Sequence, residues 1–141
     1  MHTNPDKLLL KSSVKLRGHS CRFVLLFFFA ALAGCDKDTT AADANALTGG
    51  DARQGAIAIR DHGCASCHTI PGIRGADSHV GPPLSHISQR TYLAGILQNT
   101  PENLVKWIQN PPAVDPQTAM PDMHLSDADA RNIASYLYTL R

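Results

Sequence analysis

The feature that most constrains this chain of 141 residues is one short motif, Cys64-Ala65-Ser66-Cys67-His68. It contains two cysteines with two residues between them, and a histidine directly after the second cysteine. Three kinds of site use a C-x-x-C pattern: a redox-active dithiol pair, half of a tetrahedral zinc site, and a porphyrin attached through two thioether bonds. Each of them needs different residues elsewhere in the sequence.

The rest of the sequence favours porphyrin attachment. A dithiol pair is expected beside a βαβ pattern, but no strand-rich run flanks Cys64. A zinc site needs a second pair of Cys or His, and the other two cysteines, Cys21 and Cys35, lie far upstream. C-x-x-C-H is the attachment sequence of c-type haem. We therefore expect one covalent haem c bonded to Cys64 and Cys67, with His68 as the proximal iron ligand.

The N-terminus is typical of an export signal. Residues 1–34 hold five Lys/Arg and one acid, and residues 23–33 form an apolar stretch much shorter than the roughly 20 residues of a membrane-spanning helix. The stretch ends in Leu32-Ala33-Gly34-Cys35, which resembles a bacterial lipoprotein box. The resemblance implies removal of residues 1–34 and acylation of Cys35. The alternative is a simple secretory signal with an incidental cysteine. Either interpretation places the mature chain on the periplasmic side of the bacterial cytoplasmic membrane.

The mature chain is mildly acidic, which argues against nucleic acid as a partner. From Cys35 onward it holds 8 Lys/Arg and 11 Asp/Glu, a net charge of −3. Residues 35–50, which follow the signal, are rich in Asp, Thr, Ala and Gly and have no apolar periodicity. We predict that they form a lipidated flexible tether; a frayed extension of the first helix is the alternative. Residues 51–141 then form one domain.

This domain is predicted to be all-α, with three main helices and long loops, and no segment is typical of a sheet. The helices are expected at residues 51–62, 100–110 and 126–140. Asp51, Thr100-Pro101 and Ser126 supply start signals, and Pro111-Pro112 is expected to stop the second helix. Loops this long are unusual in so small a domain, but a covalent haem is a rigid apolar disc that loops can wrap. We expect the polypeptide without haem to be largely unfolded.

A ligand for the opposite face of the iron is expected from a loop far downstream of His68. The mature chain offers two methionines, Met120 and Met123, both in residues 118–123. A thioether ligand favours ferrous iron and raises the reduction potential. Four histidines could in principle take the place of methionine, although only the last lies near this loop: His62, His79, His86 and His124.

Residues 55–141 resemble a class I cytochrome c. The matches follow the order of that family: Cys64–His68, Gly81-Pro82, Arg90, a helix over 104–110 that ends at Pro111, Met120, and Tyr136-Leu137. In the family, the methionine ligand commonly lies nine residues after the proline that closes this helix. The resemblance therefore implies Met120, and not Met123, as the second iron ligand.

The same resemblance implies roles around the haem. The backbone carbonyl of Pro82 would accept a hydrogen bond from Nδ1–H of His68, Arg90 would lie near a propionate, and Trp107 would lie beside the methionine ligand. The alternatives are a turn proline, a solvated arginine and a core aromatic residue.

A further implication concerns the helices. Gly55 would let the first and last helices cross closely, with Tyr136 packed at the crossing. The chain departs from the family in having Ile59 where an aromatic is common, and residues 69–80 are an insert of its own.

Residues 90–108 are similar to the cytochrome c domains fused to subunit II of some haem–copper oxidases. This similarity implies a lipid-anchored single-electron carrier in a periplasmic respiratory chain. Its acceptor would be a terminal oxidase and its donor a quinol-oxidising complex of the cytochrome bc1 type. With both axial positions filled, we expect neither catalysis nor a small-molecule substrate. Two alternatives stay open: an electron-accepting subunit of a periplasmic dehydrogenase, and a haem sensor or peroxidase whose methionine ligand dissociates.

Overall fold

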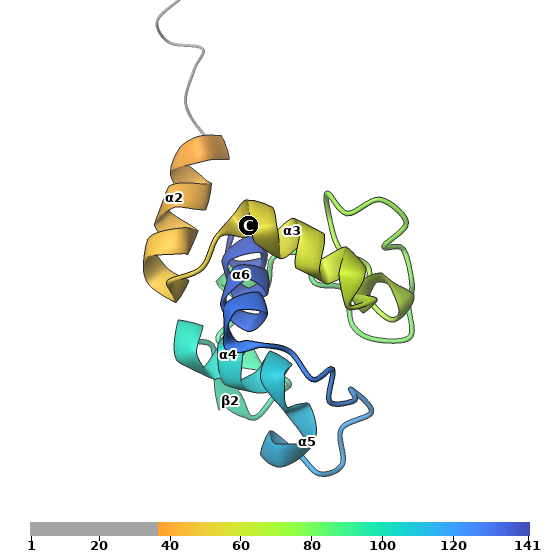
Figure 1. Ribbon diagram of the computed structural model, residues 1–141. Helices are drawn as coiled ribbons and strands as arrows, with labels where there is room; N and C mark the ends of the chain where they lie inside the picture. The colour runs from red at the N-terminus through yellow and green to blue at the C-terminus, as the bar shows by residue number, and fades with distance from the viewer. Residues whose placement is uncertain (1–36) are drawn as a thin grey trace, which may run out of the picture. The chain divides into compact units, whose positions relative to one another are not determined.

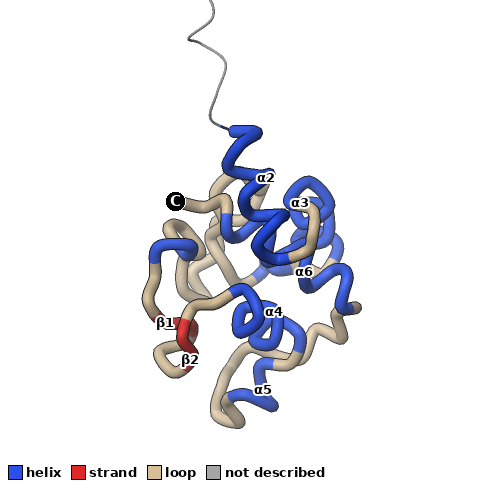
Figure 2. Tube along the Cα trace, turned by 90° about the vertical axis from the view of Figure 1, so that its left-hand side faces the viewer, coloured by secondary structure: helices blue, strands red, loops and turns tan. Residues whose placement is uncertain are grey.

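The computed structural model describes residues 37–141, so the expected signal peptide and Cys35 lie outside the described residues. Figures 1 and 2 show the elements in chain order: α2 (Lys37–Thr48), α3 (Ala52–Asp61), the 3₁₀ turns η1 (Cys64–Ser66) and η2 (Ile87–Gln89), β1 (Tyr92–Leu93), β2 (Leu97–Gln98), α4 (Pro101–Gln109), α5 (Pro111–Val114) and α6 (Asp127–Tyr138). Among the described residues, no helix has both the length and the apolar character needed to cross a bilayer.

The three predicted helices are confirmed as α3, α4 and α6, and their start signals act as expected. The side chains of Asp51, Thr100 and Ser126 each accept a hydrogen bond from a backbone N–H in the first turn. These bonds satisfy donors that a helix start leaves without partners. Helix α4 ends before Pro111, as predicted, and Pro111 is also the first residue of the short helix α5. A backbone N–H at this first position would have no partner within the helix, so the N–H that proline lacks costs nothing there.

The prediction of a flexible tether is wrong for residues 37–48, which form helix α2. Alanine is the best helix former, and this segment is rich in it. The helix packs against α6 (Figure 1), with Ala44 and Thr48 buried. Thr48 Oγ1 is hydrogen-bonded with the hydroxyl of Ser135, and the Arg131 guanidinium donates to the Thr48 carbonyl at 3.3 Å. Burial against α6 therefore orders a segment whose own sequence has no apolar stripe.

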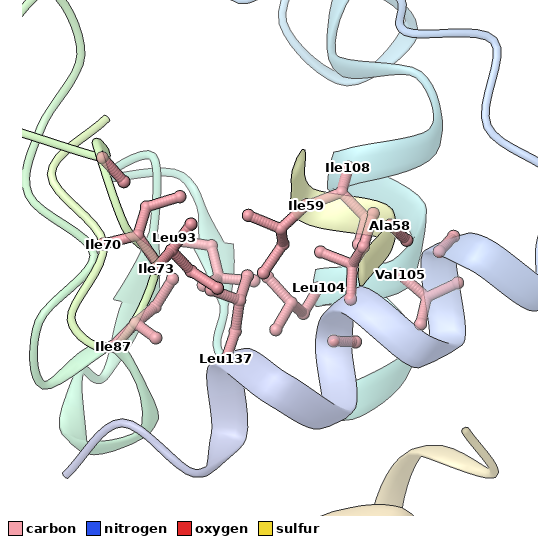
Figure 3. Packing of buried hydrophobic residues seen from close by; sticks show 14 residues of the cluster. Ala58, Ile59, Ile70, Ile73, Ile87, Leu93, Leu104, Val105, Ile108 and Leu137 are labelled. Atoms are coloured by element: carbon pink, nitrogen blue, oxygen red, sulfur yellow. The ribbon is translucent and has the colours of Figure 1, made fainter. Parts of the chain in front are cut away.

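Helices α3 and α6 cross closely at Gly55, as the resemblance implied. A Cβ atom on Gly55 would lie 2.0 Å from the backbone oxygen of Asn132 and 3.0 Å from Cβ of Tyr136. No side chain fits there. The crossing starts the hydrophobic core, which continues through α4; Figure 3 shows Ile59, Leu104 and Leu137 converging in it.

The crossing gives a stability prediction. Gly55→Val places three carbon atoms where backbone already lies, so the helices must separate, and we expect the free energy of unfolding to fall by about 3 kcal/mol. Gln54→Ala, at an exposed position of the same helix, should change it by less than about 0.5 kcal/mol. Denaturant unfolding of the haem-loaded protein measures both. Equal stability of the two variants would show that the crossing tolerates a side chain.

A small hairpin was not expected from the sequence. β1 and β2 lie side by side (Figure 2) and pair antiparallel, with Tyr92 opposite Gln98 and Leu93 opposite Leu97. Ala94 and Gly95 at the turn both have positive φ, of 49° and 76°. The two central residues of a type I′ turn need this conformation, but they are usually Asn-Gly or Asp-Gly. The Ala-Gly pair therefore gave no signal, although the all-α class stands.

Candidate haem site

A cavity of about 400 Å³ lies inside the domain, within the size range of cofactor sites. Its walls are mainly apolar and come from α3, α4, α6 and the loops that connect them. In Figure 1 the loops after α3 and before α6 lie on the same side of the α3–α6 pair. The buried side chains that line the cavity belong to the hydrophobic core: Ile59, Ile70, Ile87, Leu93, Leu104, Ile108, Ile133 and Leu137.

The C-x-x-C-H motif forms one tight turn in the cavity wall. Gly63, with φ of 70°, ends α3, and the backbone N–H groups of Cys67 and His68 then both donate to the carbonyl of Cys64, at 3.3 and 3.1 Å. This turn brings both thiols and the imidazole to the cavity. The two cysteines are not joined in a disulfide, and burial raises the pKa of the Cys64 thiol, which keeps it protonated at neutral pH.

The ring of His68 is held in one tautomer. Its Nδ1 lies 2.7 Å from the carbonyl oxygen of Pro82, which can only accept, so Nδ1 carries a proton and, in the neutral ring, Nε2 is the nitrogen with the lone pair. Gly81 is essential to this position because a Cβ atom there would lie 2.5 Å from Cε1 of His68. The expected His68–Pro82 hydrogen bond is thus present, and iron ligation through Nε2 stays a prediction. The steric role of Gly81 was not foreseen.

Both candidate methionines reach the cavity, from the loop between α5 and α6. Met120 is also packed against the hydrophobic core, as is Trp107 of α4, whereas Met123 lines the cavity without joining that cluster. The backbone N–H of Met120 donates to the side-chain oxygen of Thr118 at 3.2 Å, which fixes the loop at that point. The assignment of Met120 as the iron ligand stays a prediction.

Arg90 is the only Lys or Arg among the described residues that line the cavity. Its Nη2 donates to the backbone carbonyls of Pro83 and Ser85, the latter at 3.1 Å. A half-buried guanidinium at an apolar wall is a suitable partner for a carboxylate such as a haem propionate. The guanidinium of Arg90 also holds the segment that follows Pro82, a role that the sequence did not suggest.

The four histidines weighed as alternative ligands do not line the cavity. His62 Nε2 lies 3.6 Å from a carboxylate oxygen of Asp129, and the His124 side chain is 88% exposed with Nδ1 3.5 Å from Asp122. Groups of three or more His, Cys, Asp or Glu able to hold a metal ion do not occur in the described part of the chain.

The chemistry of the lining residues fits a haem c. Two adjacent thiols can form thioethers, an imidazole offers a free Nε2, a thioether sulfur enters the same space, and the remaining walls are apolar. Each donor type that this cofactor requires is thus present at one cavity.

Comparisons with known proteins indicate the family of this chain. The family model for cytochrome c matches residues 52–141. Cytochrome c oxidase subunit 2 of Alkalihalophilus pseudofirmus is 31% identical over 91 residues, which cover 64% of this chain and 26% of that protein. The subunit 2 proteins of Bacillus sp. strain PS3 and Bacillus subtilis strain 168 are 32% and 29% identical, over 60% and 64% of this chain and 25% and 26% of their own lengths. No solved structure gives a significant match.

The chain thus spans about a quarter of the length of these relatives. The family match covers well over half of the chain and contains the C-x-x-C-H motif and both methionines. The chain belongs to the cytochrome c family.

Proposed function

We propose that this protein is a single-electron carrier with one haem c, bonded to Cys64 and Cys67 and ligated by His68 and Met120. The observation that carries the proposal is that these four side chains line one and the same apolar cavity. When bound, the haem supplies an iron that cycles between the ferric and ferrous states. Family membership supports electron transfer as the general role.

The residues around the cavity tune and protect this chemistry. The His68–Pro82 hydrogen bond fixes the imidazole and raises its basicity. The thioether of Met120 favours the reduced state, and the apolar walls exclude water. If His68 and Met120 both hold the iron as proposed, no ligand position is left for a substrate, so we propose a carrier and not a catalyst.

The proposed acceptor is a membrane-bound terminal oxidase, with a quinol-oxidising complex of the bc1 type as donor. The similarity to cytochrome c oxidase subunit 2 supports the first of these partners. We propose that acyl chains on Cys35 hold the protein at the periplasmic face of the cytoplasmic membrane. In the sequence, one residue separates Cys35 from the first residue of α2, Lys37.

Purification of membrane complexes tests this proposal. After detergent solubilisation of membranes from the source organism, the covalent haem of this chain should elute with oxidase activity. A Cys35→Ser variant should move the same haem to the soluble fraction without changing its spectrum. Elution of the haem with a dehydrogenase would instead favour the dehydrogenase-subunit alternative, and an unchanged membrane location of Cys35→Ser would refute lipid anchoring.

A further inference from the structure

Asn99, between β2 and α4, uses its side-chain amide to join three segments of the chain. Its Nδ2 donates to the backbone carbonyls of Ile87 and Arg90, both at 2.8 Å. Its Oδ1 accepts from the hydroxyl of Tyr138 on α6 at 3.0 Å. Burial raises the pKa of this phenol, so that it remains a donor at neutral pH. The amide therefore links the segment 87–90 to the C-terminal helix.

The hydrogen bonds continue from Arg90 towards the histidine. The guanidinium of Arg90 donates to the carbonyls of Pro83 and Ser85, and the preceding carbonyl, that of Pro82, accepts from Nδ1–H of His68. Residues 82–86 lie outside any helix or strand. Three backbone bonds join residues 81–86 to the rest of the described chain: Gly81 N–H to the Cys67 carbonyl, Leu84 N–H to the Thr69 carbonyl, and Gln89 N–H to the His86 carbonyl. The guanidinium of Arg90 adds two side-chain bonds to the same segment, at Pro83 and Ser85.

We propose that Asn99 is a positioning residue for His68: by holding Arg90 against α6, it keeps the Pro82 carbonyl in place to accept from the imidazole Nδ1–H. The inference rests on the proposed function, because the position of this hydrogen bond matters through the iron ligand. The competing interpretation is that Asn99 only closes the β1–β2 hairpin and has no effect on His68.

The two interpretations differ in what happens at the imidazole. If Asn99 positions His68, its loss lets Arg90 and the Pro82 carbonyl move, which weakens the Nδ1–H bond and lowers the basicity of the ring. Nδ1–H should then exchange with solvent more readily, and the reduction potential should rise because ferric iron loses electron donation. If Asn99 only closes the hairpin, neither property changes.

The experiment uses the haem-loaded protein in its ferrous, diamagnetic state. NMR measures the exchange of the His68 Nδ1–H proton with solvent, and the midpoint potential is measured alongside. In Asn99→Ala we expect exchange on the order of tenfold faster, since one supporting hydrogen-bond system is lost, together with a higher potential. Tyr138→Phe removes only the hydroxyl that orients the amide, and it should show a smaller change in the same direction.

Asn103→Ala is the matched control. Its amide donates to the Gln98 carbonyl at 2.9 Å, in the same stretch of chain, but it has no bond to the segment 87–90. It should leave exchange and potential unchanged. The inference would be overturned if the His68 Nδ1–H exchanged at the wild-type rate in both Asn99→Ala and Tyr138→Phe. It would also be overturned if Asn103→Ala changed exchange and potential as much as Asn99→Ala does. If Asn99→Ala does not fold, the result for Tyr138→Phe decides alone. A wild-type protein without haem would refute the proposed function itself.

Discussion

Replacement of Met120 by alanine is expected to remove the sulfur–iron charge-transfer absorption of the ferric protein and to let ferrous haem bind carbon monoxide. The cavity would lose the thioether that is packed against the hydrophobic core. Water or an added ligand could then reach the iron. Because thioether ligation favours ferrous iron, the potential should also fall, by on the order of 0.1 V within the roughly 0.8 V that axial ligands control.

Met123→Ala is the control for this result. Met123 lies three residues further along the same loop and lines the same cavity, so its removal deletes a similar apolar volume. We expect it to keep the charge-transfer absorption and to remain unreactive towards carbon monoxide. Optical spectra of both variants decide the assignment. If Met123→Ala loses the absorption and Met120→Ala retains it, the ligand has been assigned to the wrong methionine.

The parts of the fold that the sequence predicted are those set by local chemistry. Asp51, Thr100 and Ser126 are side chains that cap helices through bonds to their own first turn, so their effect does not depend on the rest of the fold. The C-x-x-C-H turn is equally local. The His68–Pro82 contact joins residues further apart, and it was expected only because the order of motifs resembles a known family.

The parts that could not be predicted depend on partners distant in sequence. Helix α2 has no apolar stripe of its own, and it is ordered by contacts such as that between Thr48 and Ser135. The role of Asn99 needs Tyr138 and Arg90 beside it, and a single asparagine before a helix gives no signal of this. The spacing of apolar residues in a sequence indicates which face of a helix is buried. It does not indicate which polar side chains from distant segments will form hydrogen bonds in the folded chain.

The largest expected effect concerns the haem itself: a Cys64→Ser/Cys67→Ser double variant produced without haem should be largely unfolded. The side chains that line the cavity, including Ile59, Leu104 and Leu137, are also the centre of the hydrophobic core. Without haem these apolar walls would face empty space or water, and the core would lose the contacts that a bound porphyrin supplies. A typical domain is stable by only about 5–15 kcal/mol, so we expect the loss of its central contacts to unfold it.

Circular dichroism and denaturant unfolding measure this outcome. The double variant should lose most of the helical signal of the haem-loaded protein and show no cooperative transition. Ser66→Ala is the control, because Ser66 lies between the two cysteines and its exposed hydroxyl donates to the Gly63 carbonyl at 2.7 Å. It should keep both haem and fold. A haem-free double variant with native helicity and a cooperative transition would mean that α3, α4 and α6 hold together without a cofactor between the loops. The cavity would then be a preformed binding site, and the long loops of this small domain would need another source of order.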